Sequence, residues 1–225
     1  MVAAGDSMRE DANAALNRLC QTYWYPIYVF VRRKGLGPDE AEDLTQAFFV
    51  DFLSRNQVSR ADRSRGRFRS FLVVSLENFL HNQWRRQAAQ KRGGGRSPIS
   101  LDAERAEARF AAEPLDTLAP DIAYALQWAR ALLDQTTCAL EAEWISNRRE
   151  GLFQALLTHL WSDADAIPYT ELSARFDLTP VNLRVTFHRY RQRYRELLRE
   201  AVATTVADPD EVDDELRFLM EVVSR

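Results

Sequence analysis

The chain has 225 residues, of which 46% are hydrophobic and 28% charged, and its formal net charge is -3. This composition is typical of a folded protein and excludes global disorder. Cys20 and Cys138 lie far apart in the sequence, which disfavours a disulfide framework and a structural zinc site. No stretch is long and apolar enough to cross a bilayer. We therefore expect a cytoplasmic protein without a metal or a cofactor.

Basic residues gather in two segments of this mildly acidic chain. Residues 55–96 contain eleven Lys and Arg against two acids, and residues 184–199 contain six Arg against one acid. Acidic residues collect between 102 and 121 and again from 208 to 221. Two basic segments on either side of an acidic connector favour a polyanionic partner, whereas the simpler interpretation is a pair of solvated basic surfaces.

The first third of the chain predicts three helices. Apolar residues recur every three or four positions from Leu16 to Val31, and the segment KGLGPDEAED then ends this helix and opens a second one. The buried stripes of the second and third helices are Ala41, Leu44, Phe48 and Phe52, then Phe71, Leu72, Leu76, Phe79 and Leu80. We place a first all-helical domain at residues 12–95, before the glycine-rich break.

Residues 96–121 lack sustained periodicity and are expected to be a flexible linker, with a short helix near Ala103–Phe110. A helical pattern resumes in a second domain at residues 122–205, and residues 206–225 form an acidic extension. Within the second domain, Tyr169–Phe176 predicts a short helix, and Thr179 caps a longer helix that starts at Pro180. The expected fold is all-α, with two small domains and a helix-turn-helix in the second.

The helix after this turn carries the candidate residues for reading duplex DNA. Arginine binds guanine bidentately, asparagine binds adenine, and further arginines bind phosphates. The candidate base-reading residues are Asn182, Arg184, Thr186, His188 and Arg189, followed by Arg191 and Arg193 for phosphates. The alternative is an ordinary amphipathic helix with an arginine-rich solvated face.

The first basic segment combines arginines with flat rings and amides, which suits unpaired bases. Aromatic rings stack on bases, and amides bind the edges of an extruded base. The candidate residues are Arg65, Arg67, Phe68, Arg69, Asn78, Arg85 and Arg86. The alternative is that Phe68 and Phe71 belong to the core and the arginines only flank it.

The second helix carries a candidate protein-docking stripe. Glu42, Gln46 and Phe49 fall on one side of it, opposite Leu44 and Phe48, and exposed aromatic residues are enriched at contacts. The acids at its start also stabilise the helix N-terminus. The three histidines lie in no catalytic motif, so we predict no catalytic residue and no enzyme.

Three segments, in this order, resemble bacterial extracytoplasmic-function sigma factors. DEAEDLTQAFF resembles their polymerase-docking signature, RGRFRSFLVVSLENFLHNQWRR their promoter-melting segment, and YTELSARFDLTPVNLRVTFHRYRQRYRELL their terminal helix-turn-helix. The resemblance covers about residues 12–95 and 122–203.

The resemblance implies a subunit that is monomeric when free and binds core RNA polymerase through the clamp helices and the flap. It implies that Glu42, Asp43, Gln46 and Phe49 bind polymerase and that Asn78 captures a flipped base of the −10 element. Arg184, His188 and Arg189 would contact the −35 element of the promoter DNA. An anti-sigma protein or a Ser/Thr kinase is the expected regulator.

Three features depart from the family pattern, one of which is the absence of the usual leucine-proline pattern from Asn147–Ala166. Ala47 replaces the usual acid, and phosphorylation of nearby Thr45 is a hypothesis for restoring the negative charge. The acidic extension places Val212, Leu216, Leu219 and Val223 at helical spacing. It would either fold back on the second basic segment as an inhibitor or pack on its own domain.

Two rival functions fit parts of the sequence. A stand-alone helix-turn-helix regulator would bind duplex operators as a dimer, but it leaves the first basic segment and the docking stripe unexplained. An adaptor would bind polymerase or a kinase without reading DNA.

Overall fold

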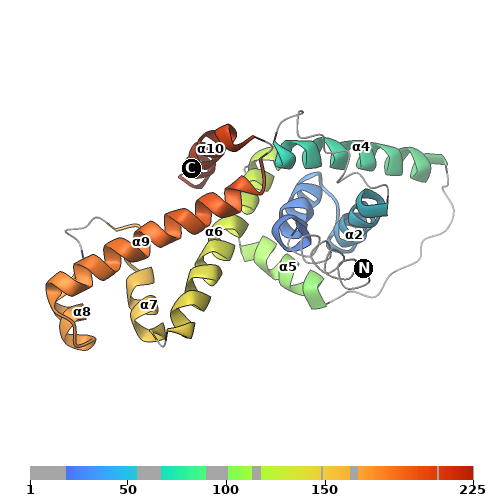
Figure 1. Ribbon diagram of the computed structural model, residues 1–225. Helices are drawn as coiled ribbons and strands as arrows, with labels where there is room; N and C mark the ends of the chain where they lie inside the picture. Colours follow the sequence, from blue (N-terminus) through green and yellow to red (C-terminus); the bar gives the residue numbers. More distant parts are fainter. Residues whose placement is uncertain are drawn as a thin grey trace, which may run out of the picture. The chain divides into compact units, whose positions relative to one another are not determined.

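The computed structural model describes residues 19–54, 67–89, 101–112, 118–147, 149–162, 167–206 and 208–224 (Figure 1). In these ranges the chain forms helices and turns and no strand, which confirms the all-α prediction. The chain divides into two compact units. The first, unit 1, joins Met1–Ala131 with Thr205–Arg225, and the second, unit 2, is Leu132–Thr204.

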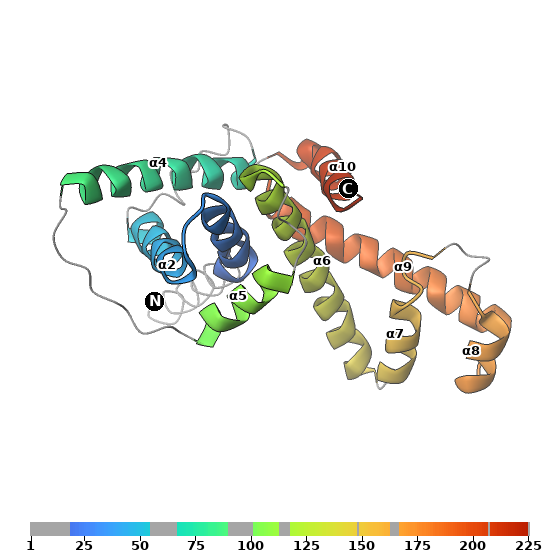
Figure 2. The ribbon, with the colours of Figure 1, turned by 180° about the vertical axis from the view of Figure 1, so that it is seen from behind.

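Unit 1 is built around a pair of helices. A helix occupies the described residues 19–33 (here the first helix), and α2 follows at Pro38–Ser54. The helices α4 (Phe68–Ala89) and α5 (Leu101–Ala112) cross opposite sides of this pair (Figures 1 and 2). The start of α6 (Pro120–Ser146), the 3₁₀ turn η2 (Pro209–Glu211) and α10 (Val212–Val223) complete the unit.

The core of unit 1 is rich in aromatic residues because the apolar positions of α2 and α4 recur at helical spacing. The Phe48 ring centroid lies 5.5 Å from that of Phe52 and 5.7 Å from that of Phe79. On α6, Trp128 is fully buried, and its indole Nε1 donates a hydrogen bond of 3.3 Å to the Tyr23 hydroxyl on the first helix. Helix α6 therefore contributes directly to the core around the first helix.

The unit boundaries differ from the expected domain boundaries at 95/96, 121/122 and 205/206. The expected linker contains α5, which packs against α2. The first turns of α6 belong to unit 1, where Ala123 and Val29 form a buried cluster that Phe110 of α5 joins. The acidic extension also belongs to unit 1. Packing between segments that are distant in the sequence decides which helices belong to each unit. The glycine- and proline-rich composition of the sequence indicates only where helices are interrupted.

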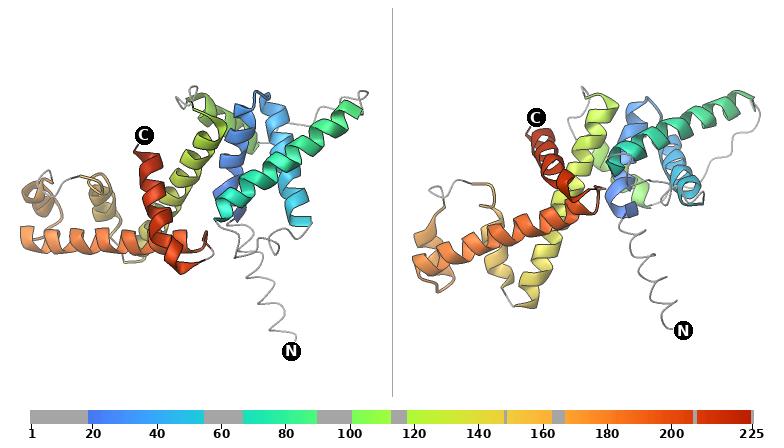
Figure 3. Two further views of the ribbon diagram at one scale, coloured as in Figure 1. Left: turned by 90° about the horizontal axis from the view of Figure 1, so that it is seen from above. Right: turned by 45° about the horizontal axis from the view of Figure 1, so that its top comes forward.

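Unit 2 contains the rest of α6, α7 (Glu150–Leu157), α8 (Tyr169–Arg175) and α9 (Pro180–Ala203) (Figure 3). Its core centres on Tyr190 of α9. The Tyr190 ring centroid lies 5.3 Å from that of Trp144 on α6 and 5.8 Å from that of Phe153 on α7. Among the described helices, none has the length and apolar character needed to cross a membrane.

Candidate nucleic-acid interface

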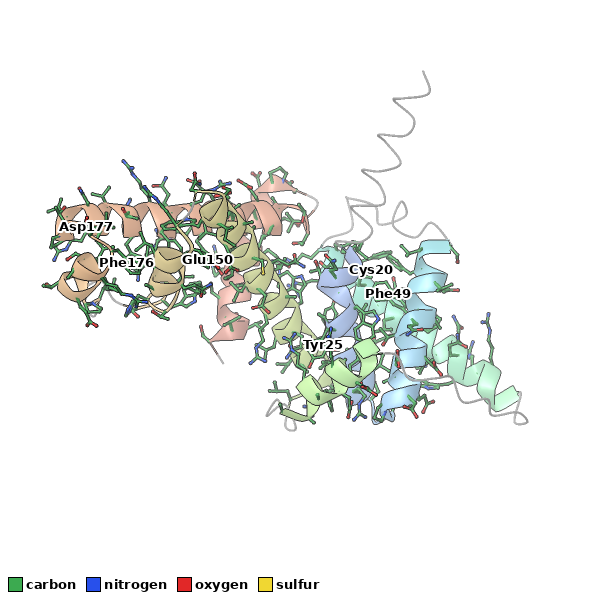
Figure 4. The ribbon with its side chains drawn as sticks, turned by 90° about the horizontal axis from the view of Figure 1, so that it is seen from below. Cys20, Tyr25, Phe49, Glu150, Phe176 and Asp177 are labelled. Carbon is green, nitrogen blue, oxygen red and sulfur yellow. The ribbon has the colours of Figure 1, made fainter. Side chains whose placement is uncertain are left out.

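The helix-turn-helix expected from the sequence is present in unit 2. Helix α8 ends at Arg175, and Asp177 in the turn has a φ of 52°, a left-handed conformation that aspartate tolerates better than most residues (Figure 4). The Thr179 hydroxyl then accepts a hydrogen bond of 3.2 Å from the Asn182 backbone N–H, and Pro180 occupies the first helical position. These two features confirm the predicted cap and start of α9.

The first turns of α9 separate a buried face from an exposed polar face. Leu183 and Phe187 are buried and hold the helix in unit 2. The exposed side chains are Asn182, Arg184, His188 and Arg189, with Thr186 half-buried. The Arg184 guanidinium lies 5.0 Å from the Tyr169 ring centroid of α8, so the two helices of the motif are in contact there. This face presents amide and guanidinium donors in the pattern that reads base edges in a major groove.

Two exposed apolar residues lie on the same turns. Val181 is 69% exposed and Val185 is 45% exposed. Neither valine is expected at a site from the sequence, because valine in an amphipathic helix usually belongs to the core. Their exposure beside asparagine and arginine suits contact with thymine methyl groups.

Arg191 was predicted to bind a phosphate, and the structure instead gives it partners within unit 2. Its Nη2 donates to the His159 carbonyl at 3.0 Å and to the Ser162 carbonyl. Its guanidinium also lies 4.4 Å from the Phe187 ring centroid. Arg191 therefore connects α9 to the end of α7.

Arg193 was also predicted to bind a phosphate, and it is paired in the same way. Its Nη2 lies 2.8 Å from Glu143 Oε1 on α6, and Nη1 lies 3.3 Å from Glu196. The hydrogen bonds from Arg193 hold the pKa of the Glu143 carboxyl below its usual value. The carboxylates in turn raise the pKa of the guanidinium. Arg191 and Arg193 thus have partners within unit 2, and their binding of phosphate stays a prediction.

A polar cavity of about 180 Å³ lies along α4 in unit 1, with Asp51 of α2 also in its lining. Its lining includes Asn78, the candidate for base capture, and Arg86. The other lining residues are Asp51, Ser75, Phe79, Asn82 and Gln83. Three amides and a guanidinium supply hydrogen-bonding groups for the edge of an extruded base, whereas the Phe79 ring is buried against Phe48.

Asn82 and Gln83 were not among the predicted site residues. Asn78 and Asn82 are four positions apart, so their side chains lie on one face of the helix, and this spacing was the signal available in the sequence. The remaining predicted arginines of α4, Arg85 and Arg86, are exposed near its end.

At the start of α4, Arg67 and Arg69 do not project freely into solvent. Both form ion pairs with Glu215 of α10, at 3.0 Å from Arg67 Nε and 2.5 Å from Arg69 Nε. In this arrangement both arginines are paired with Glu215, and their contact with DNA stays a prediction. Arg65 lies outside the described residues.

The Phe68 side chain is half-buried and packs against aromatic residues of unit 1. Its ring centroid lies 5.4 Å from that of Tyr23 and 6.3 Å from that of Phe71. Phe68 thus takes part in the aromatic packing of unit 1, and its stacking on an unpaired base stays a prediction.

The docking stripe on α2 is only partly exposed. Glu42 and Phe49 are 5% and 6% exposed, whereas Asp43 and Gln46 are exposed. Gln46 Nε2 donates a hydrogen bond of 2.9 Å to Glu42. The exposed face of α2 is therefore Asp43, Gln46 and the 69% exposed Val50, and the expectation of an exposed Phe49 is corrected.

Thr45 is also inaccessible. Its side chain is fully buried, and its hydroxyl donates a hydrogen bond of 2.7 Å to the Ala41 carbonyl. A kinase needs this hydroxyl in its active site, so the folded unit 1 does not support phosphorylation of Thr45.

Across the described ranges, no three His, Cys, Asp or Glu side chains converge in a way that could hold a metal ion. Comparison of the chain with protein-family models, with curated proteins and with solved structures gave no match.

Proposed function

We propose that this chain is a sigma-type subunit of bacterial RNA polymerase that directs transcription from promoters with two recognised elements. The observation that carries the proposal is the capped helix-turn-helix of α8 and α9, whose exposed face bears Asn182, Arg184, His188 and Arg189. Such a face supports recognition of duplex DNA.

The cavity on α4 supports the second half of the proposal. Duplex readers need no amide-lined cavity, whereas a protein that opens promoter DNA must hold an extruded base. Asn78, Asn82 and Gln83 supply hydrogen-bonding groups, and Arg85 and Arg86 supply positive charge beside them. The duplex-reading and base-holding groups occupy different units of the chain.

Polymerase docking is assigned to the exposed face of α2. Asp43, Gln46 and Val50 combine a charge, an amide and an apolar side chain within two turns. This face is smaller than the resemblance implied, since Glu42 and Phe49 are buried.

The test is binding of the labelled full chain to core RNA polymerase, followed by initiation on a library of genomic promoters. We expect tight association and discrete start sites that share two sequence elements. Replacing both Arg184 and Arg189 with alanine should abolish selection of the upstream element while polymerase binding persists. Arg199→Ala, which removes one positive charge further along α9, is the matched control for the single variants Arg184→Ala and Arg189→Ala.

Other results would contradict the proposal in distinct ways. Tight duplex binding by a dimer without polymerase would indicate a stand-alone regulator. Polymerase binding that is insensitive to promoter sequence, in both the wild type and the double variant, would indicate an adaptor.

A further inference from the structure

The C-terminal helix α10 places a carboxylate where the first basic segment would bind an anion. The Glu215 side chain is fully buried. Its Oε1 lies 2.5 Å from Arg69 Nε, and its Oε2 lies 3.2 Å from Arg69 Nη2 and 3.0 Å from Arg67 Nε. One carboxylate is thus bound by two arginines, in a fork geometry that also suits a phosphate.

The Arg69 guanidinium is further enclosed by aromatic rings. It lies 3.7 Å from the Phe218 ring centroid on α10 and 5.4 Å from the Trp128 ring centroid on α6. The side chain of Arg69 is only 12% exposed as a result. Because Phe218 is one helical turn from Glu215, the same face of α10 supplies both the carboxylate and the ring.

The backbone around this contact is also held in place. The Tyr124 hydroxyl of α6 donates a hydrogen bond of 3.3 Å to the Arg69 carbonyl. The Phe68 backbone N–H donates one of 3.3 Å to the Thr205 carbonyl, just after α9 ends. The start of α4 is therefore fixed to the segment that leads into α10.

The distribution of buried and exposed residues on α10 shows that this contact differs from an ordinary surface ion pair. Its apolar side is buried through Val212, Leu219 and Val222, and its other acids, including Asp213 and Asp214, are exposed. Among the acids described in this helix, Glu215 lies on the buried side. A buried carboxylate is costly without cationic partners, so Glu215 depends on Arg67 and Arg69.

We propose that α10 is an intramolecular competitor for nucleic acid, with the Glu215 carboxylate standing in for a DNA phosphate at Arg67 and Arg69. Binding of DNA at these arginines requires Glu215 to leave them, so the free chain binds DNA weakly until α10 is displaced. This inference rests on the proposed function, because it assumes that the first basic segment meets DNA.

The test compares the full-length wild type with Glu215→Gln, which keeps the shape of the side chain and removes its charge. Asp214→Asn is the matched control, since Asp214 is exposed and pairs with Arg217 on its own helix. The probes are a short fluorescein-labelled oligo(dT) strand and a duplex of random sequence, with affinity measured against NaCl concentration. Thermal unfolding of each variant is measured in parallel.

Release of two arginines should steepen the salt dependence of binding to the single strand. Each phosphate contact contributes about 0.7 to the slope of log affinity against log salt, so we expect an increase of about 1.4 for Glu215→Gln. Between about 50 and 200 mM NaCl this corresponds to roughly a sevenfold larger fall in affinity. Asp214→Asn should keep the wild-type slope. If Glu215→Gln does not fold, Phe218→Leu removes the ring over Arg69 while keeping an apolar side chain, and should steepen the slope by a smaller amount.

Four outcomes would overturn the proposal. An unchanged slope of log affinity against log salt in a folded Glu215→Gln protein with lowered thermal stability would show that the contact only stabilises the fold. Equal steepening by Asp214→Asn would reduce it to a general charge effect. If wild type and variants bind core polymerase and initiate normally with equal slopes, the competitor is rejected and the proposed function stands. Failure of all proteins to bind polymerase and either DNA probe would reject both.

Discussion

Glu107 of α5 binds Arg32 of the first helix through two hydrogen bonds, although 75 positions separate them in the chain. Arg32 Nε donates at 2.9 Å and Nη2 at 2.7 Å, and the Tyr28 hydroxyl adds a third hydrogen bond of 2.6 Å. The carboxylate is thus a shared acceptor for two side chains of the first helix. This network fixes α5 to unit 1 in a segment whose sequence is typical of a linker.

Glu107→Gln should lower the free energy of unfolding of unit 1 by about 1 to 2 kcal/mol, because charge-assisted hydrogen bonds become neutral ones. Urea unfolding followed by circular dichroism measures the change. Glu104→Gln on the same helix is the control, since Glu104 is exposed, and it should unfold like the wild type. Equal stability of Glu107→Gln and Glu104→Gln would contradict the anchoring role.

The effect of Glu107→Gln should depend on pH. The hydrogen bonds from Arg32 lower the pKa of the Glu107 carboxyl below its ordinary value of 4.5. A carboxyl whose pKa is lower in the folded state adds stability above the unfolded pKa, and this contribution is lost as the pH falls through the folded value. The difference in unfolding free energy between wild type and variant should therefore be full at neutral pH and shrink below pH 4.5. A difference that grows on acidification would contradict this sign.

Thr45→Glu should destabilise unit 1 by roughly 3 kcal/mol or more, because it buries an unpaired charge. Val50→Glu is the control on the same helix, since Val50 is 69% exposed, and it should leave the melting temperature nearly unchanged. Mass spectrometry after kinase treatment provides a second measurement. Phosphate on Thr45 of the folded protein would show that α2 opens enough to expose this hydroxyl.

Arg191→Met should lower stability and Arg189→Met should weaken promoter binding, although each removes one positive charge from the same helix. Arg191→Met leaves the His159 and Ser162 carbonyls without their donor and should cost unit 2 about 1 to 3 kcal/mol in unfolding free energy. Arg189 is exposed, so Arg189→Met should leave stability unchanged and weaken promoter binding. Thermal unfolding and a promoter-binding titration on both proteins test the pair, and a reversed pattern would overturn the assignment of Arg191.

Asn78→Ala should slow promoter opening by about tenfold, because a base held by an amide loses its partner. Permanganate reactivity of unpaired thymines, measured with the polymerase complex, reports opening directly. His81→Ala is the control, because His81 is exposed on α4 and is not part of the cavity lining. If the Asn78→Ala protein opens promoters at the wild-type rate, the proposed role of the cavity in promoter opening is contradicted.

The sequence was sufficient where structure depends on neighbours along the chain. The cap at Thr179, the start of α9 at Pro180 and the short α8 all follow from local hydrogen bonding and from the dihedral preferences of single residues. Helical periodicity likewise predicted Phe48 and Phe52 as core residues of α2, as observed. The amphipathic pattern of the sequence also agrees with the exposure of Arg184 and Arg189 on α9.

Only the tertiary structure decided which polar side chains remain available to a partner. Local pattern treats Arg189 and Arg191 alike, yet one is exposed and the other binds carbonyls near the end of α7. In the same way, Glu42 is buried and Arg69 meets Glu215 across 146 positions of sequence. The physical reason is that burial and ion pairing depend on which distant segments pack together, and helical periodicity carries no information about the identity of the neighbouring helix.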